Sequence, residues 1–233
     1  MREFQESHLW ADLVRGANGA GEACDRLAAF VAETLTDDEI REKYLERAIR
    51  ELNSLTRELQ TCELCPRGNL MPVLGSGHPQ ADVMLLKYAA TASEAEEGVA
   101  FYGRAGNALM KALRRLQIDP LAVYGTLCVK CPVSDPSLAD PGCIHRVLEE
   151  IAIVQPKIIV AMGEQALDAL EELQVPLSRP LEARFGEIQQ LTPSIDALYV
   201  PTIDDALDEE EAKREFWSSF RVLGTWYADL PPY

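Results

Sequence analysis

Residues 155–173 read QPKIIVAMGEQALDALEEL, an apolar run that breaks at Gly163 and continues with helical spacing. The run at 157–162 is short and rich in isoleucine and valine, which is typical of a buried strand. Residues 164–173 place apolar side chains three and four positions apart, as one face of a helix requires. This stretch therefore predicts a strand that passes directly into a helix.

The same alternation extends in both directions along the chain. Strands are expected at 82–86, 121–129, 157–162 and 198–202, and helices at 106–116, 143–154, 164–173 and 209–226. Strands that alternate with helices of this length predict a parallel sheet covered on both faces. Such sheets place their sites where the strands end. The loops at 87–103, 130–142 and 203–208 are therefore the candidate site loops.

The N-terminal part of the chain has a different pattern, without strands. Short helices are expected at 8–14 and 22–34, on either side of a glycine-rich break. The pair Thr36-x-x-Glu39 then has the form of a helix capping box, and apolar residues recur at three- and four-residue intervals after it. We expect a helical extension over residues 1–54 and a main domain over residues 55–233.

The charge of the chain limits what it can bind. It has 38 acidic and 22 basic residues, a formal net charge of −16, and such a surface repels a phosphate backbone. We expect weak or no direct DNA binding by the isolated chain. The sequence shows no apolar run of membrane-spanning length and no basic, apolar signal peptide at its start, so we expect a cytoplasmic protein without membrane contact.

Four cysteines have the spacing Cys62-x2-Cys65, Cys131 and Cys143. In a chain that keeps its thiols reduced, this spacing favours a metal site over disulfides. Zinc could use the two pairs Cys62-x2-Cys65 and Cys128-x2-Cys131, although the second pair lies at the end of a strand, where alternate side chains diverge. Zinc, an iron–sulfur cluster and free buried cysteines all stay open on spacing alone.

From about residue 55 to residue 223, the chain resembles the iron–sulfur uracil-DNA glycosylases called family four. The motifs that carry the resemblance are Cys62-x2-Cys65-Pro66, Gly98-x2-Phe101-x-Gly103-Arg104-Ala105-Gly106, Val129-Lys130-Cys131-Pro132, Cys143 and the PKIIVAMG stretch at 156–163. The resemblance implies an α/β fold, a three-layer α/β/α sandwich around a central, mostly parallel four-stranded sheet. It also implies a 4Fe–4S cluster held by Cys62, Cys65, Cys131 and Cys143, and leaves zinc as the less favoured metal.

The resemblance fails where that family carries out its reaction. The family's Gly-Glu-Ala-Pro-Gly loop aligns with residues 87–91, KYAAT, so that Tyr88 replaces the glutamate that helps to set up the attacking water. Leu127 replaces the base-reading asparagine, and Asp204 replaces the histidine that stabilises the departing base. Only Phe101 matches the family's pocket, at the phenylalanine that stacks on uracil.

These departures predict a protein that has lost family-four catalysis and keeps its cluster as a structural element. We expect a scaffold or partner-binding subunit with a protein partner, linked to DNA repair or replication, rather than an enzyme. The alternative is an active DNA glycosylase that acts on deaminated bases with an atypical pocket.

Overall fold

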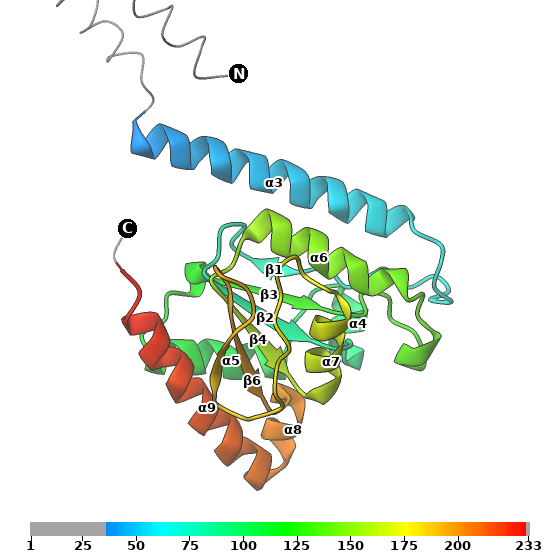
Figure 1. Ribbon diagram of the computed structural model, residues 1–233. Helices are drawn as coiled ribbons and strands as arrows, with labels where there is room; N and C mark the ends of the chain where they lie inside the picture. The colour runs from blue at the N-terminus through cyan, green and yellow to red at the C-terminus, as the bar shows by residue number, and fades with distance from the viewer. Residues whose placement is uncertain (1–35, 232–233) are drawn as a thin grey trace, which may run out of the picture. The chain divides into compact units, whose positions relative to one another are not determined.

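The computed structural model describes residues 36–231 of the chain (Figure 1). The helices expected at 8–14 and 22–34 lie outside these residues. The chain divides into two compact units, 1–46 and 47–233. Helix α3, Asp37–Thr61, begins with the predicted capping box: the Glu39 amide donates to Thr36 Oγ1 at 3.3 Å, and the Thr36 amide donates to Glu39 Oε2 at 2.7 Å.

The second unit is built on a six-stranded sheet with the order β1-β3-β2-β4-β6-β5. The four central strands β3, β2, β4 and β6 are parallel, and β1 and β5 add short antiparallel edges. The strands are β1 Ser76–Gly77, β2 Val83–Lys87, β3 Val123–Leu127, β4 Ile158–Met162, β5 Ile188–Gln190 and β6 Asp196–Val200. The α/β fold with a mostly parallel sheet is confirmed, and the four predicted strands form its centre.

Helices cover both faces of this sheet, as Figure 1 shows. One face packs against α5 Arg104–Arg115, α8 Ile203–Asp208 and α9 Glu210–Ala228, and we call it the α5 face. The other packs against α6 Gly142–Val154 and α7 Glu164–Glu172, and we call it the α6 face. Every residue of β2, β3 and β4 is buried, which is why these strands read as continuous apolar runs.

The part of α3 that belongs to the second unit packs onto the α6 face. Leu52 contacts the core on that face, and Leu55 and Leu59 are buried one and two turns later. The Arg146 guanidinium on α6 donates to Glu58 Oε2 at 2.9 Å. This packing holds the end of α3 in place, and Cys62 follows directly after it. None of the described helices is long and apolar enough to cross a membrane.

Two short helices were not predicted, and both lie in loops that follow a central strand. Helix α4 spans Ala92–Glu97 after β2, and α8 spans Ile203–Asp208 after β6. Each begins at a threonine: Thr91 forms a second capping box, and Thr202 Oγ1 accepts the Asp205 amide at 3.0 Å. The predicted strand at 198–202 therefore ends at Val200, because the chain turns into the α8 cap.

Candidate functional site

Three of the predicted metal-binding cysteines lie together. Cys65 follows α3, Cys131 follows β3, and Cys143 is the second residue of α6. Their three sulfur atoms lie within 4.8 Å of one another, and all three side chains are buried. Segments far apart in the sequence thus bring three soft thiol ligands to one point, as a thiolate-bound metal site requires.

Backbone amides that donate to Cys65 and Cys143 fit a metal site with thiolate ligands. The Asp140 amide donates to Cys65 Sγ at 3.2 Å. Hydrogen bonds from the Cys131 thiol and from the backbone amides of Lys130 and Cys131 lower the pKa of Cys143. The pKa of Cys131 is raised because its thiol donates to Cys143 and is buried. Amide donors aimed at cysteine sulfur are a common means of stabilising thiolate ligands and tuning clusters.

The other two described cysteines in this region lie outside the group. Cys62 comes directly after α3 and is half-buried. Cys128 is fully buried in the core of the α6 face, and burial raises its pKa to about 12. The zinc arrangement that pairs Cys128 with Cys131 is therefore not assembled. Cys62 lies three residues before Cys65 in sequence, so a fourth thiol is available close to the group.

A buried ionic network joins the two elements that deliver Cys131 and Cys143. Lys130 Nζ donates to Glu150 Oε2 at 2.7 Å, to Thr126 Oγ1 at 2.7 Å and to the Leu127 carbonyl at 3.0 Å. The Tyr124 hydroxyl donates to Glu150 Oε1 at 3.0 Å, and burial beside Glu150 raises the pKa of Tyr124. Glu150 is on α6 and Lys130 directly precedes Cys131. The network therefore holds α6 against β3 and the segment that carries Cys131.

A second charged cluster lies where β2 ends. Lys87, the last residue of β2, places its Nζ 2.6 Å from Glu94 Oε2 and 3.0 Å from Asp204 Oδ2. The Lys87 side chain is 4% exposed, that of Glu94 is fully buried, and that of Asp204 is 37% exposed. One ammonium thus connects the loop after β2 with the first turn of α8. We call these three residues the Lys87 cluster.

Glu94 also holds the neighbouring loop in place. Its Oε2 accepts the Thr91 amide at 2.7 Å and the Thr91 hydroxyl at 2.8 Å, and its Oε1 accepts the Phe101 amide at 2.6 Å. Phe101 has a φ of 58°, which is unusual for a residue other than glycine. Its ring needs the absence of a side chain at Gly125, where an added Cβ would lie 2.5 Å from the ring. Glu94 thus stabilises a strained phenylalanine.

The structure places the four predicted pocket residues as follows. Phe101 and Leu127 lie in the core of the α5 face, Phe101 is 9% exposed and Leu127 is fully buried. Asp204 is paired with Lys87, whose Nζ is 5.7 Å from the centroid of the Phe101 ring. Tyr88 packs against the core of the α6 face and so lies apart from the other three. Lys87, rather than Tyr88, is the side chain that reaches the pocket region.

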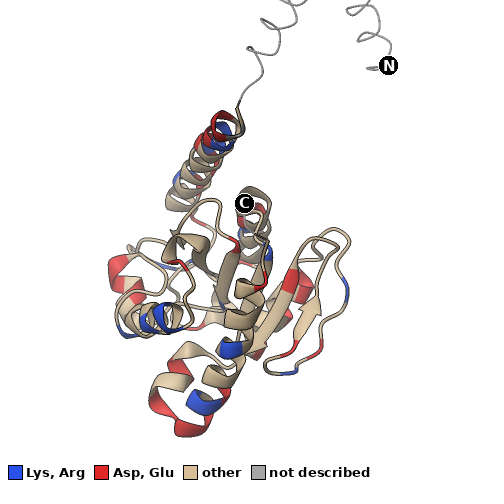
Figure 2. Ribbon diagram, turned by 90° about the vertical axis from the view of Figure 1, so that its left-hand side faces the viewer, with Lys and Arg blue, Asp and Glu red and all other residues tan. Residues whose placement is uncertain are grey.

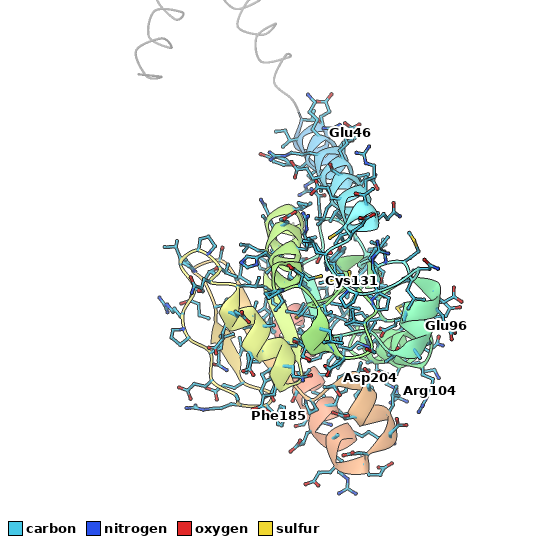
Figure 3. The ribbon with its side chains drawn as sticks, turned by 90° about the vertical axis from the view of Figure 1, so that its right-hand side faces the viewer. Glu46, Glu96, Arg104, Cys131, Phe185 and Asp204 are labelled. Carbon is cyan, nitrogen blue, oxygen red and sulfur yellow. The ribbon has the colours of Figure 1, made fainter. Side chains whose placement is uncertain are left out.

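The cysteine group and the Lys87 cluster are separate sites, because Cys131 and Asp204 are clearly apart in Figure 3. The sequence interpretation missed Glu94. The signal was available: Thr91-x-x-Glu94 has the same capping-box form as Thr36-x-x-Glu39. The charged groups of the Lys87 cluster satisfy one another. The Glu94 carboxylate accepts four hydrogen bonds, and the Lys87 ammonium is shared between Glu94 and Asp204.

Replacing Lys87 by methionine should reduce the free energy of unfolding by about 3 kcal/mol, measured by urea denaturation. The substitution leaves the carboxylate of Glu94 buried without its ammonium, and breaking a buried pair from one side costs about this much. Lys111→Met removes the same charge from an exposed helix position and should change stability by less than about 0.5 kcal/mol. An equal, small effect of both substitutions would show that the Lys87 cluster adds nothing to stability.

Comparison with known proteins agrees with this architecture. A sequence model of the uracil DNA glycosylase superfamily matches residues 74–221. The chain is 34% identical over 133 residues to the Type-4 uracil-DNA glycosylase of Pyrobaculum aerophilum, a match that covers 53% of this chain and 66% of the relative. It is 31% identical over 121 residues to the Type-4 uracil-DNA glycosylase of Thermotoga maritima, covering 48% and 62% respectively. The chain thus spans less than two thirds of the length of either relative.

The matched region begins before β1 and ends within α9, so it includes all six strands and the helices on both faces of the sheet. It contains Cys131, Cys143 and the Lys87 cluster, and only the Cys62–Cys65 pair precedes it. The chain therefore belongs to the uracil-DNA glycosylase superfamily, and these two relatives place it with family four.

Proposed function

We propose that this protein is a non-catalytic member of its superfamily, a scaffold or partner-binding subunit that acts in DNA repair or replication. The observation that carries this proposal is the position of the Lys87 ammonium. It lies between Glu94 and Asp204 and ties together the two loops that, by the family resemblance, would have to receive the base. A base would have to break two ion pairs to enter.

The groups around Lys87 also lack the chemistry of uracil excision. Leu127, at the position of the base-reading asparagine, offers no hydrogen bond and is fully buried. Asp204, at the position of the histidine, puts a negative charge where the departing base would become an anion, and such a charge is repulsive. The carboxylate of Glu94 is occupied by Lys87, Thr91 and Phe101.

We further propose that the cysteine group holds a 4Fe–4S cluster, with Cys62 as the fourth ligand beside Cys65, Cys131 and Cys143. The support is the gathering of three buried thiols, the amide donor to Cys65 and the similarity to two Type-4 uracil-DNA glycosylases. When bound, such a cluster supplies four iron–thiolate bonds that link α3, the segment after β3 and α6. The role of the chain's own residues is to bury these sulfurs and fix their spacing.

An active DNA glycosylase with an altered pocket is the second candidate. The observation that favours it is the presence of three ionisable groups at the end of β2, one of which, Asp204, is 37% exposed. Charged groups at the C-terminal ends of parallel strands are a usual feature of active sites in α/β proteins. A single-turnover assay on DNA that contains uracil, hypoxanthine or xanthine separates the two candidates: release of any of these bases would support the second and overturn the first.

The isolated protein should bind a uracil-containing duplex with a dissociation constant weaker than about 10 μM at physiological salt. The net charge of −16 repels the phosphate backbone of DNA. Helix α8 adds to this repulsion because three of its six residues are acidic: Asp204, Asp205 and Asp208. Fluorescence anisotropy with a labelled duplex measures this, and the Thermotoga maritima relative provides the comparison. Tight binding that weakens steeply as salt is added would contradict the prediction.

A further inference from the structure

An apolar groove of about 260 Å³ opens between α5, α8 and α9. Its floor consists of Ile203, Ala206 and Phe216, which are buried, and Leu207 and Trp217 form half-exposed walls. We call it the α8 groove. It is too small for most substrate or drug-sized ligands, which occupy about 300–1,000 Å³, but it has room for one large apolar side chain.

Three basic side chains surround this groove, although the chain as a whole is strongly acidic. Lys111 and Arg115 project from α5 one turn apart, and Lys213 comes from α9. The Arg115 guanidinium lies 5.5 Å from the centroid of the Trp217 ring, and Lys213 Nζ is 3.0 Å from Glu210. Within residues 36–231, Lys111 makes no ion pair. Arg115 lies in the last turn of α5, where a cation also suits the helix dipole, whereas Lys111 lies one turn earlier.

The nearby carboxylates of α8 do not neutralise these cations. Asp204 pairs with Lys87 at 3.0 Å, and Asp208 pairs with Arg104 at 2.9 Å. In Figure 2, α8 and the start of α9, lowest in the view, carry both acidic and basic positions. Asp204 and Asp208 are therefore paired with cations outside the groove, whereas Asp205 is exposed and Lys213 is paired with Glu210. Lys111 is a rim cation that these carboxylates leave without an ion pair.

We propose that the α8 groove binds an acidic amphipathic segment of a partner protein. One apolar side chain of that segment would fill the groove, and its carboxylates would pair with Lys111, Arg115 and Lys213. This inference rests on the proposed role as a partner-binding subunit and names the chemistry of the partner. A helix laid into a groove through an apolar anchor is a common mode of peptide recognition.

The structure favours such a segment over nucleic acid. A phosphate backbone gains nothing from an apolar floor, and its continuous negative charge would be repelled by the acidic residues of α8 and the start of α9, such as Asp205 and Glu211. A peptide can place its carboxylates only where the cations are. The apolar anchor and the rim charges together supply the specificity that neither has alone.

The test uses fluorescein-labelled synthetic helical peptides with a single Phe or Leu on one face and Glu and Asp at the positions that flank it, so that the anchor and the carboxylates can reach the groove and its rim together. Scrambled isomers of the same composition serve as the peptide control. In anisotropy titrations of the full chain, Lys111→Glu should weaken binding about fivefold or more, and Trp217→Ala about tenfold or more. Arg221→Glu makes the same charge change on α9 outside the groove and should have an effect below about twofold.

Several results would overturn the groove proposal. Equal binding of the scrambled isomers, or an equal loss in Arg221→Glu and Lys111→Glu, would indicate unspecific charge attraction. A single-stranded oligonucleotide that displaces the peptide and loses its own binding in Lys111→Glu would make this a nucleic-acid site. No binding of any patterned peptide up to about 1 mM would also refute the proposal. Uracil excision, by contrast, would overturn the proposed function and leave a positive peptide result intact.

Discussion

In single-turnover assays, this protein should excise uracil from single- or double-stranded DNA at least about 10⁴-fold more slowly than the Thermotoga maritima relative. A preorganised group that stabilises a developing anion contributes about 10²–10³ in rate, and a positioned acid or base contributes about 10²–10⁴. By the family resemblance, Asp204 stands at the position of the first group and Tyr88 at that of the second. If the two losses multiply, the rate falls by about 10⁴ or more. The loss is smaller where the two groups act together in one step, because their effects then do not multiply fully.

The structure adds a physical obstacle to these chemical losses. The substitution pair Tyr88→Glu and Asp204→His restores the two residue types of the family, but it should not restore excision. Tyr88 packs against the α6 face, so a glutamate there would start from the wrong side of the sheet. Leu127 would still fail to recognise the base, and Lys87 would keep its contact with Glu94.

The assay has a clear contradicting outcome. Release of uracil within minutes at stoichiometric protein, lost on Asp204→Ala, would show that the Lys87 cluster is a working active site. The Arg221→Glu variant serves as the control for preparation and folding, because it changes an exposed position of α9 away from that cluster.

Anaerobically purified protein should contain about four irons per chain and absorb broadly near about 400 nm, as expected for a cubane held by thiolates. Cys143→Ser should lose nearly all of this iron and much of the stability of the fold. The reason is that Cys143 is one of three sulfurs within 4.8 Å, and metal binding is coupled to folding where ligands come from separate segments.

Cys128→Ser provides the matched control, since it makes the same chemical change at another buried cysteine. Cys128 lies in the core of the α6 face, so its variant should keep the iron and lose only packing energy. Metal content by elemental analysis and stability by urea denaturation measure both variants. One zinc without iron in the wild type, or loss of metal only in Cys128→Ser, would refute the iron–sulfur assignment.

The central sheet could be predicted from the sequence because its strands are buried on both faces. A strand buried on both faces needs a continuous apolar run, such as IIVAM at 158–162. Such a run can be recognised in the sequence without knowing which strands lie beside it. Edge strands β1 and β5 were missed because two or three residues carry no periodicity. Helices α4 and α8 are six residues long and also carry no periodicity, so the sequence signal that α4 offers is its cap, Thr91-x-x-Glu94.

The site was predicted less completely, because its key contacts join residues distant in sequence. Cys65, Cys131 and Cys143 were identified by spacing and resemblance and do lie together. Motif alignment gave Tyr88 the place of the family's glutamate, but alternation along the chain after β2 sends Tyr88 to one face and Lys87 to the other. The pairing of Lys87 with Asp204 spans 117 positions, and nothing local in the sequence indicates it.

The Lys87 cluster also restricts which descendants of this sequence are accessible by single mutations. Loss of Lys87 alone leaves Glu94 as a buried anion. Loss of Glu94 alone leaves the buried ammonium paired only with the partly exposed Asp204, and removes the acceptor of the Phe101 amide. Under the proposed loss of catalysis, each first substitution toward a family-four loop would therefore give a less stable protein before it could add activity. The ion pair between Lys87 and Glu94 would then make the proposed loss of catalysis hard to reverse by single mutations.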